Sequence, residues 1–455
     1  MKNIDIAIIG AGPAGMAAAI RLYKNGVKNI VVFERNDRLG GILNQCIHSG
    51  FGIEYYKDEL TGPEYSAKMS KEFLDLNIPF KLNSMVINLN GKRELTVSSF
   101  DSGIEKYKAK AVILATGCRE RTRENLEIAG SRPAGIFNAG QAQELINLKN
   151  YRLGKKVIIQ GSGDIGLIMA RRLTIEGYEV IKVFERLPYL SGLIRNKVQC
   201  LDDYNIPIEF NAQISKIAGK HRVTGVYVER LDNNQTPITG TEEFYECDTV
   251  LFSVGLIPEV EIGKKAGVTL FNNFNPDVNS KFESNSEGIF ICGNSLHIHD
   301  LADGASFEGE KVADSVCQYL KNKDEFEKGK NGETPYNQEG KEEKFNEEFF
   351  NSLSSDKMVC TICPKGCIIS GNSHGCKRGK EFYYRERDCK KRRVATTIYV
   401  DSGDDKRRIP VITVEEVDIK DVQVIKEELR KIRQIEQNKF ELKYDGKIIH
   451  FTSVI

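Results

Sequence analysis

Short apolar runs, each closed by glycine or by an acidic residue, recur along most of the chain. The first is IDIAII at residues 4–9; a glycine-rich turn at 10–15, a helical pattern through Tyr23 and a second apolar run at 30–34 follow it. Uninterrupted apolar runs predict strands buried on both faces, as in a parallel sheet. Strand, helix and strand in this order predict a βαβ unit.

The same succession returns in the middle of the chain. Residues 157–160 and 180–185 have strand patterns, and 165–176 has a helical pattern. Two βαβ units with additional buried strands predict the α/β class, with two Rossmann-like, three-layer domains. The additional elements that we expect are strands at 111–115, 249–255 and 288–293 and a helix at 305–320.

The pattern changes at Lys321. Residues up to Asp356 are rich in Lys, Glu, Asn and Gly, which predicts a solvated linker with a helix around 342–353. The remaining residues predict a small α+β module with strands at 394–401 and 409–414 and an amphipathic helix over 420–435.

Length, charge and cysteine usage narrow the class of protein. A chain of 455 residues fits two or three domains. Because 65 basic and 64 acidic residues leave a net charge of +1, a nucleic-acid partner is not expected, and the basic run 390–393 is interpreted as a solvated surface. No apolar run reaches the roughly 18 residues that span a bilayer, and because the N-terminus runs straight into its first motif, no signal peptide is expected. The 11 cysteines do not form a disulfide framework, so a reduced, cytoplasmic protein is expected.

The first glycine-rich turn, GAGPAG at residues 10–15, follows a strand and opens a helix. Gly10 permits the tight turn, Gly12 lets the backbone approach a pyrophosphate, and Gly15 allows close packing of helix on strand. The helix N-terminus supplies N–H donors to the phosphates. Glu34 ends the next strand, where a carboxylate can accept both ribose hydroxyls. The spacing predicts a dinucleotide site.

The second glycine-rich turn, GSGDIG at residues 161–166, has Glu185 at the equivalent place. A carboxylate there repels a 2′-phosphate, so this site favours NADH over NADPH. The adjacent Arg186 would weaken that preference.

Both turns, with residues 39–41, 115–117 and 291–294, resemble the flavoproteins with two dinucleotide-binding domains. This group contains the pyridine nucleotide-disulfide oxidoreductases and the ferredoxin reductases. The resemblance spans residues 4–320 and implies FAD in the first site and NAD(H) in the second. It assigns to FAD the residues Gly10, Gly12, Pro13, Ala14, Gly15, Glu34, Arg35, Gly40, Gly41, Ala115, Thr116, Gly117, Gly293, Asn294 and Ala305. It assigns to NAD the residues Gly161, Ser162, Gly163, Asp164, Ile165, Gly166, Glu185, Arg186 and Gly255.

The chain departs from this family pattern in two ways. Asn294 replaces the aspartate that contacts the ribityl chain of the flavin. Disulfide reductases of the group also need a dithiol beside the flavin, but only Cys46 follows the Gly-Gly turn, and only Cys200 and Cys247 lie in the second domain. Disulfide reduction there is therefore disfavoured. Cys46 and His48 are candidates for the far face of the flavin, and no side chain is assigned as a general acid or base.

The sequence HIHD places His297 and His299 on one side of an extended segment. Two imidazoles alone do not define a metal site, and no third ligand is evident from the sequence. We therefore expect a loop near the flavin edge here.

Four cysteines, Cys360, Cys363, Cys367 and Cys376, form a C-x2-C-x3-C-x8-C cluster. Thiolates select zinc or iron–sulfur clusters. Structural zinc sites usually take their cysteines from two short segments that are separated along the chain. Three closely spaced cysteines followed by glycine-rich turns are instead typical of a segment that wraps around an iron–sulfur cluster. An iron–sulfur cluster is favoured; zinc and metal-free redox thiols remain open. Cys389 is interpreted as an ordinary core thiol.

Further segments narrow the resemblance. GGILNQCIHSGFG, ATGCRERTRE and HIHDLADGASFEGE resemble the NAD-linked flavoprotein subunit of anaerobic glycerol-3-phosphate dehydrogenase systems, and CTICPKGC with GCKRG resembles a small cysteine-rich domain that accompanies such flavoproteins. The resemblance implies an electron-transfer subunit that connects NADH, FAD and the cysteine-bound centre to a separate FAD-dependent dehydrogenase. Two alternatives stay open: a thiol or disulfide reductase that uses the C-terminal cysteines as a mobile dithiol, and a flavoprotein with a zinc-stapled docking domain.

The predicted organisation is thus discontinuous. Residues 1–120 and 260–322 form the FAD-binding domain, 121–259 the NAD(H)-binding domain, 323–356 the charged linker and 357–455 the cysteine-rich, iron–sulfur domain.

Overall fold

A computed structural model of the chain describes residues 1–271, 274–321, 344–353, 356–373, 375–402, 405–432, 439–444 and 447–453. The chain divides into two compact units, and each is described by itself. Unit 1 comprises Met1–Cys46, Phe51–Arg119 and Leu256–Glu342. Unit 2 comprises Ile47–Gly50, Glu120–Gly255 and Glu343–Ile455. The C-terminal cysteines therefore belong to the same unit as the second glycine-rich turn.

Unit 1 is built on a sheet of order β5-β2-β1-β8-β7-β6, with β22 also paired to β8. Strands β5, β2, β1, β8 and β22 run parallel; β7 pairs antiparallel with β8, and β6 pairs antiparallel with β7. The first half of β8 pairs with β7 and its last residues pair with β22, so its burial changes from alternating to continuous. The bounds are β1 Lys2–Ile9, β2 Ile30–Phe33, β5 Phe80–Lys81, β6 Ser84–Leu89, β7 Glu94–Ser99, β8 Gly103–Leu114 and β22 Ile289–Ile291.

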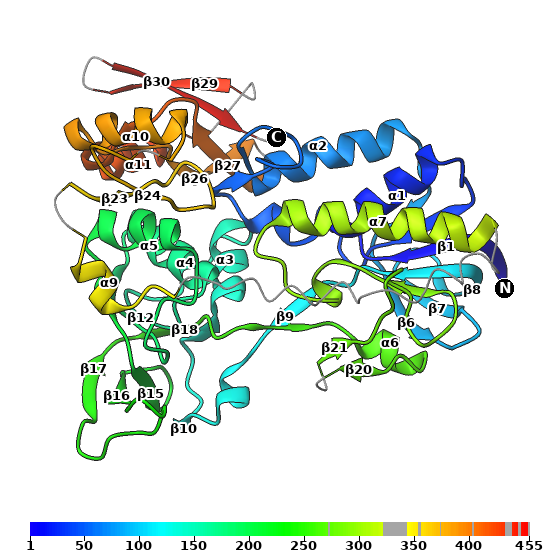
Figure 1. The fold of residues 1–455 in the computed structure, drawn as a ribbon, viewed down its shortest axis with the longest axis horizontal. Helices are drawn as coiled ribbons and strands as arrows, with labels where there is room; N and C mark the ends of the chain where they lie inside the picture. Colours follow the sequence, from blue (N-terminus) through cyan, green and yellow to red (C-terminus); the bar gives the residue numbers. More distant parts are fainter. Residues whose placement is uncertain are drawn as a thin grey trace. The chain divides into compact units, whose positions relative to one another are not determined.

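Two helices lie side by side in unit 1 (Figure 1): α1 (Pro13–Lys24) and α7 (Ala302–Lys321). Their close approach depends on small residues, because a Cβ atom added at Gly309 would lie 2.2 Å from the Ala14 carbonyl oxygen. A third helix, α2 (Gly62–Asp75), begins with a capping box between Thr61 and Glu64, which satisfies the first N–H groups of the helix.

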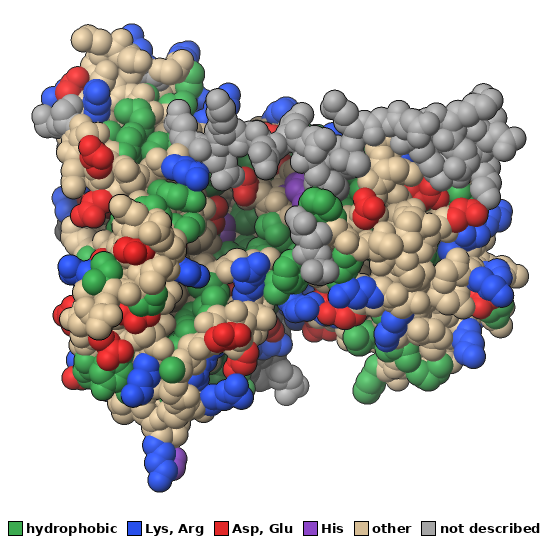
Figure 2. Space-filling model, turned by 60° about the horizontal axis from the view of Figure 1, so that its bottom comes forward, with side chains coloured by type: hydrophobic (Ala, Val, Ile, Leu, Met, Phe, Trp, Pro, Cys, Tyr) green, Lys and Arg blue, Asp and Glu red, His purple; other side chains and the backbone are tan. Residues whose placement is uncertain are grey.

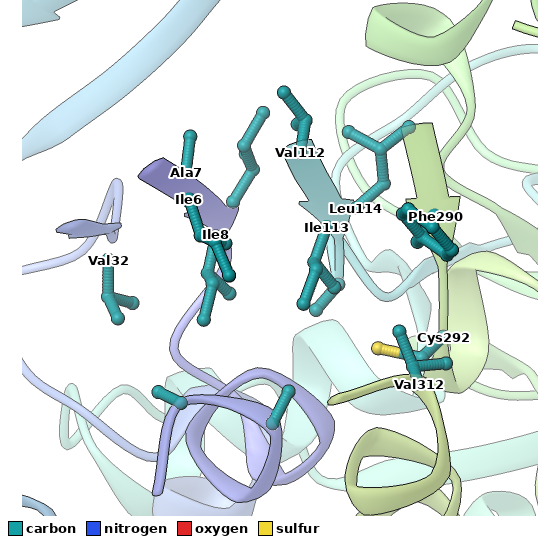
Figure 3. Packing of buried hydrophobic residues seen from close by; sticks show 14 of the residues in the cluster. Ile6, Ala7, Ile8, Val32, Val112, Ile113, Leu114, Phe290, Cys292 and Val312 are labelled. Atoms are coloured by element: carbon teal, nitrogen blue, oxygen red, sulfur yellow. The ribbon is translucent and has the colours of Figure 1, made fainter. Parts of the chain in front are cut away.

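The core of unit 1 lies between the parallel strands and these helices. Figure 3 shows Val32, Ile8 and Ile113 pointing toward the helices, while Ala7 and Val112 point to the opposite face. All of these side chains are buried, as expected for strands covered on both faces. The uninterrupted apolar runs of the sequence are explained by this double coverage.

Unit 2 contains a parallel sheet of order β11-β18-β12-β13-β14 and a second sheet of order β10-β15-β16-β17. The second glycine-rich turn connects β12 to α4, as the first connects β1 to α1. The bounds are β10 Ala129–Gly130, β11 Ile136–Asn138, α3 Ala139–Asn147, β12 Lys156–Gln160, α4 Asp164–Ile175, β13 Glu179–Phe184, α5 Ile194–Cys200, β14 Ile208–Glu209, β15 Ala212–Ala218, β16 Gly225–Arg230, β17 Glu243–Glu246 and β18 Thr249–Phe252.

The C-terminal part of unit 2 forms an antiparallel sheet of order β26-β27-β30-β29 that packs with helix α11. A hairpin of β23 and β24 and the helix α10 precede it and carry the four clustered cysteines. The bounds are β23 Met358–Val359, β24 Ile368–Ile369, α10 Lys377–Asp388, β25 Lys391–Arg392, β26 Ala395–Ser402, β27 Asp405–Thr413, β28 Val417–Asp418, α11 Val422–Leu429, β29 Lys439–Tyr444 and β30 Lys447–Ser453.

The α/β class is confirmed, and the predicted strands and helices around both glycine-rich turns are present with ends that shift by a few residues. The helix predicted around 342–353 is the shorter α9 (Glu347–Asn351), and the helix predicted over 420–435 is α11. Within the predicted linker, Phe345, Phe349 and Phe350 pack against the core of unit 2. That end of the segment is therefore partly packed on unit 2 and not a free linker, although its polar residues are exposed; residues 322–343 lie outside the described residues.

Among the described residues, no helix combines the length and the apolar character needed to cross a bilayer. On the face drawn in Figure 2, basic and acidic side chains are intermingled. This distribution is in keeping with the net charge of +1.

Candidate functional site

The glycine-rich turn of unit 1 has the geometry that a bound dinucleotide requires. Gly10 has a φ of +106°, and a Cβ atom there would lie 2.2 Å from the Ala115 carbonyl oxygen. A Cβ atom at Gly15 would lie 2.0 Å from the Gly10 carbonyl oxygen. At Gly12, in contrast, an added Cβ would meet no protein atom within 4 Å. Two glycines thus serve the packing of the turn, and the middle one leaves space beside the first N–H groups of α1.

Other predicted FAD residues converge on this turn from distant parts of unit 1. An added Cβ at Gly41 would lie 3.1 Å from the Cα atom of Gly12, and one at Gly293 would lie 2.7 Å from the Cβ of Ala14. Both glycines have positive φ, so larger residues would be strained as well as crowded. Pro13 begins α1, and Ala305 is buried in α7. The other predicted residues lie next to these elements or turns: Ala115, Thr116 and Gly117 follow β8, and Gly40 precedes Gly41. Arg35 is exposed.

Asn294 is held in place by a backbone contact. Its side-chain oxygen accepts a hydrogen bond of 3.1 Å from the N–H of His299. The asparagine at the position of the family's aspartate thereby orders the loop that carries the two histidines.

The two acidic residues predicted to bind ribose share one hydrogen-bond pattern. Glu34 accepts from the N–H of Ala11 at 2.8 Å and from that of Asn36 at 2.9 Å. Glu185 accepts from the N–H of Ser162 at 2.7 Å and from that of Leu187 at 2.9 Å. In each site the carboxylate is therefore buried against its own glycine-rich turn, where the ribose of a dinucleotide would lie. The repeat indicates that both sites are built for the same class of ligand.

The second turn repeats the packing of the first. A Cβ added at Gly161 would lie 2.1 Å from the Ser253 carbonyl oxygen, and one at Gly166 would lie 2.7 Å from the Ser253 Cβ. Of the other predicted NAD residues, Gly163 caps α4, Asp164 and Ile165 lie in its first turn, Gly255 has a φ of +102°, and Arg186 is exposed. Asp164 accepts from the N–H of Leu193 at 2.8 Å, which ties the start of α5 to this turn.

A sequence profile of the family described as "Pyridine nucleotide-disulphide oxidoreductase" matches residues 4–309. The chain belongs to this family. It is accordingly an oxidoreductase that depends on FAD and a nicotinamide dinucleotide, and the two repeated turns fit these two cofactors.

Curated relatives of this flavoprotein include components of larger enzymes. The hydrogen cyanide synthase subunit HcnB of Pseudomonas protegens is 25% identical over 332 residues, which cover 68% of each chain. The glutamate synthase [NADPH] small chain of Escherichia coli is 28% identical over 342 residues, which cover 69% of this chain and 68% of that one. The thioredoxin reductase of Bacillus subtilis is 25% identical over 324 residues, which cover 70% of this chain and 95% of that one.

Solved structures agree on the fold. The thioredoxin reductase of T. acidophilum has a TM-score of 0.58 and 23% identity, and the alignment covers 71% of this chain and all of that one. The thioredoxin reductase of Lactococcus lactis has a TM-score of 0.59 and 22% identity, with coverage of 70% and 99%.

Within the described residues, the three thiols that the sequence offered for a dithiol in the nucleotide-binding parts are not activated. The 11 cysteines all lie within the described residues, and none of them is in a disulfide bond. Burial raises the pKa of Cys46 and of Cys247 to about 12, and burial raises the pKa of Cys200 to about 11. Since the thiolate is the reactive form, these thiols are poor nucleophiles at neutral pH. Cys200 and Cys247 also lie in different core clusters of unit 2.

His48 belongs to unit 2, whereas Cys46 belongs to unit 1. Burial, together with the positive charges of Arg171 and Arg195, lowers the pKa of His48 to about 4, so this imidazole is neutral. The proposed role of both residues at the flavin stays a prediction.

The four clustered cysteines lie on one loop system of unit 2. The N–H of Cys360 donates to the carbonyl of Cys367 at 2.8 Å, and Cys376 caps α10, where its sulfur accepts from the N–H of Gly379 at 3.4 Å. A helix N-terminus stabilises a thiolate. Burial raises the pKa of Cys360, and the neighbouring thiols of the cluster add to that effect. Thiolates are soft donors that suit an iron–sulfur cluster or zinc, but among the described residues these four sulfurs are not found as a group with ligand atoms within 4.8 Å of one another, so the metal centre stays a prediction.

This cysteine loop is packed against the nucleotide-binding part of unit 2. A Cβ added at Gly366 would lie 2.4 Å from the Ile194 side chain of α5, and Gln199 donates to the carbonyl of Thr361 at 3.4 Å. Val359 is buried in the same core cluster as Ile194.

A buried ion-pair network fixes the C-terminal sheet and α11 to α4. The carboxylate of Glu176 pairs with Arg172 at 2.5 Å, with Lys426, with Arg430 at 3.7 Å and with Arg408 at 3.9 Å. Burial opposes ionisation, but the charges of Arg172 and Lys426 dominate and lower the pKa of Glu176 to about 2. Arg172 also donates to Thr396 at 3.1 Å. The C-terminal sheet and α11 are thus joined by specific contacts to the C-terminal end of α4, the end opposite the second glycine-rich turn.

One functional candidate was missed by the sequence interpretation. Within the described part of the chain, three metal-ligand atoms lie within 4.8 Å of one another at His297, His299 and Glu308. Glu308 lies on α7. How this helix packs against the HIHD loop could not be derived from the spacing of the residues in the sequence. Burial lowers the pKa of His297, and the nearby His299 lowers it further.

The first and second glycines of unit 1 allow a matched test of the FAD site. Gly12→Ala should change the free energy of unfolding of the flavin-free protein by less than about 1 kcal/mol but sharply reduce its FAD content, because the methyl group enters the space of the pyrophosphate. Gly10→Ala should destabilise the same protein by about 2–4 kcal/mol. Urea unfolding and flavin content measure both effects. Normal FAD content in Gly12→Ala would contradict the assignment.

Proposed function

We propose that this flavoprotein uses NADH and exchanges electrons with a separate partner dehydrogenase through a centre held by Cys360, Cys363, Cys367 and Cys376. The observation that carries the proposal is that these cysteines belong to the same compact unit as the second dinucleotide turn and that their loop packs against α5 of that unit. When bound, FAD supplies the step between two-electron hydride transfer and one-electron transfer. The protein's own residues bind and orient the cofactors.

The residues divide this work between the two units. In unit 1, Gly12 and the N-terminus of α1 would face the FAD pyrophosphate, and Glu34 its ribose. In unit 2, Gly163 and Glu185 would do the same for NADH. The cysteine loop on α5 would hold the centre through four thiolates, and an iron–sulfur cluster is favoured over zinc because the centre has to accept single electrons.

A separate partner is supported by the kind of proteins that this chain resembles. Hydrogen cyanide synthase subunit HcnB and the glutamate synthase small chain are both named as parts of larger enzymes. We infer that this chain likewise works within a complex, whose other component oxidises or reduces the organic substrate. A glycerol-3-phosphate dehydrogenase partner rests on sequence resemblance alone, and the relatives named above do not support it.

The packing of the C-terminal segment argues against a mobile dithiol. A dithiol that shuttles must leave its docking surface, whereas here Gly366 packs closely against Ile194 of α5, and Arg392 pairs with both Glu386 of α10 and Asp203. Electron stoichiometry tests the proposal. Anaerobic titration with NADH should deliver more than the two electrons that FAD alone accepts, and uptake of two electrons only would favour the zinc-stapled alternative.

The nucleotide preference follows from Glu185. Glu185→Gln should lower the ratio of kcat/KM for NADH to that for NADPH by about 10-fold, because it removes the charge that repels the 2′-phosphate. Arg186→Ala is the matched control and should raise the same ratio, since the exposed guanidinium attracts that phosphate. Steady-state kinetics with both nucleotides and a dye acceptor measure the ratios. Equal ratios in the wild-type protein and in both variants would show that Glu185 and Arg186 do not determine the preference between NADH and NADPH.

A further inference from the structure

We propose that His297, His299 and Glu308 of unit 1 form a second metal site, which holds one divalent transition-metal ion through three protein ligands and leaves one coordination position open. The site is separate from the cysteine cluster, which belongs to unit 2.

The distances between the ligand atoms fit coordination. The His297 Nδ1 lies 3.4 Å from one Glu308 oxygen, and the His299 Nε2 lies 3.2 Å from the other. Two ligands of a tetrahedral ion with bonds of about 2.0–2.1 Å are separated by about 3.3 Å. The 3.4 Å separation at His297 is longer than the usual N–H···O hydrogen bond of about 2.7–3.2 Å, whereas the 3.2 Å contact of His299 fits a hydrogen bond as well as coordination. Both imidazoles face the same carboxylate, and their ring centroids are 4.0 Å apart.

The carboxylate is buried and oriented as a ligand would be. Glu308 is only 6% exposed, and one of its oxygens accepts from the N–H of Gly293 at 2.5 Å. Among the described residues, its ion-pair partners are the two histidines. A buried carboxylate needs compensating positive charge, and a metal ion would supply it. The Gly293 N–H would act as the outer partner that fixes a metal-bound carboxylate.

The histidines are also positioned by their surroundings. The N–H of His299 donates to Asn294, and a Cβ atom added at Gly304 in α7 would lie 3.0 Å from the His299 Nδ1. The ring is therefore held between the loop and the helix. Two imidazoles and one carboxylate suit Zn²⁺ or Fe²⁺ and do not suit Mg²⁺ or Ca²⁺, which prefer oxygen ligands alone. His297 is partly exposed, which leaves the open position accessible to water or to a small oxygen ligand.

The test uses the full-length, flavin-loaded chain that carries Cys360→Ser and Cys363→Ser, so that the cysteine centre does not contribute metal. Equilibrium dialysis against Zn²⁺, and separately against Fe²⁺ without oxygen, should give one bound ion per chain for at least one of them. His297→Gln in this background should weaken binding about 10-fold or more. Gly304→Ala should weaken it too, because the added methyl group displaces the His299 ring without removing a ligand.

His221→Ala is the control, since His221 is exposed on unit 2. It should bind the ion as the parent chain does, and equal flavin content in all variants would show that unit 1 is folded. Absence of a bound ion in the parent chain, or binding that is unchanged by His297→Gln, would overturn the proposal. In that case the two histidines and Glu308 form a hydrogen-bonded cluster only.

Discussion

Replacement of both Cys360 and Cys363 by serine leaves the reduction of FAD by NADH unchanged and lowers electron transfer to a one-electron acceptor by about 100-fold or more, because a centre that loses two of four thiolates is not assembled. Both half-reactions can be followed in one preparation. Anaerobic bleaching of the flavin measures the first, and reduction of cytochrome c, or of the copurified partner, measures the second.

The control for this experiment is Cys389→Ser. Cys389 lies in the same C-terminal segment but outside the cluster, and its thiol donates to Asp418 at 3.1 Å. We expect both half-reactions to be unchanged in this variant. Equal loss of both half-reactions in the Cys360/Cys363 double variant would contradict the relay, because the cysteines would then support the flavin or the fold.

Replacement of Glu176 by glutamine destabilises unit 2 by about 3–5 kcal/mol, because it leaves Arg172 and Lys426 buried without their anion. Urea unfolding measures the loss. Limited proteolysis should also release the C-terminal segment from the variant before the wild-type protein is cut. Exposed Glu179→Gln, close by on β13, is the matched control and should shift stability by less than about 0.5 kcal/mol.

The ion-pair network around Glu176 also makes the stability of unit 2 depend on pH. The pKa of Glu176 is about 2 in the folded chain and near 4.5 without its partners. Its ionised form therefore stabilises the fold at and above pH 4.5, and this contribution is lost as the pH falls toward 2. Glu176→Gln lacks this contribution, so the gap in stability between the two proteins should narrow over that range. A constant gap would show that the charge of Glu176 does not hold the C-terminal segment.

The nucleotide turns could be predicted from the sequence because their information is local. Gly10, Gly12 and Gly15 lie within six positions of one another, and the backbone geometry that they require is independent of the rest of the chain. The strand ends that carry Glu34 and Glu185 follow from short apolar runs. The order of strands, β5-β2-β1-β8, could not be read in this way, since it depends on pairing between distant segments.

The remaining features depend on tertiary packing, which the local sequence pattern does not determine. Glu308 joins His297 and His299 only because α7 folds back on the loop before it. The segment around Phe349 has the charge pattern of a linker, yet its aromatic residues are half-buried against the core of unit 2. In the sequence, Glu176 is only an acidic residue at the end of a predicted helix, with no sign that it is buried in an ion-pair network. Three of its four basic partners come from the C-terminal segment, far along the chain.

The most direct test of the central claim is to measure iron, zinc and acid-labile sulfide in anaerobically purified protein and to record its electron paramagnetic resonance spectrum after addition of NADH. The account predicts iron and sulfide at the four cysteines and a reduced cluster signal that appears with NADH and is absent from the Cys360/Cys363 double variant. Zinc in place of iron at these cysteines, or a cluster that NADH does not reduce, would contradict it.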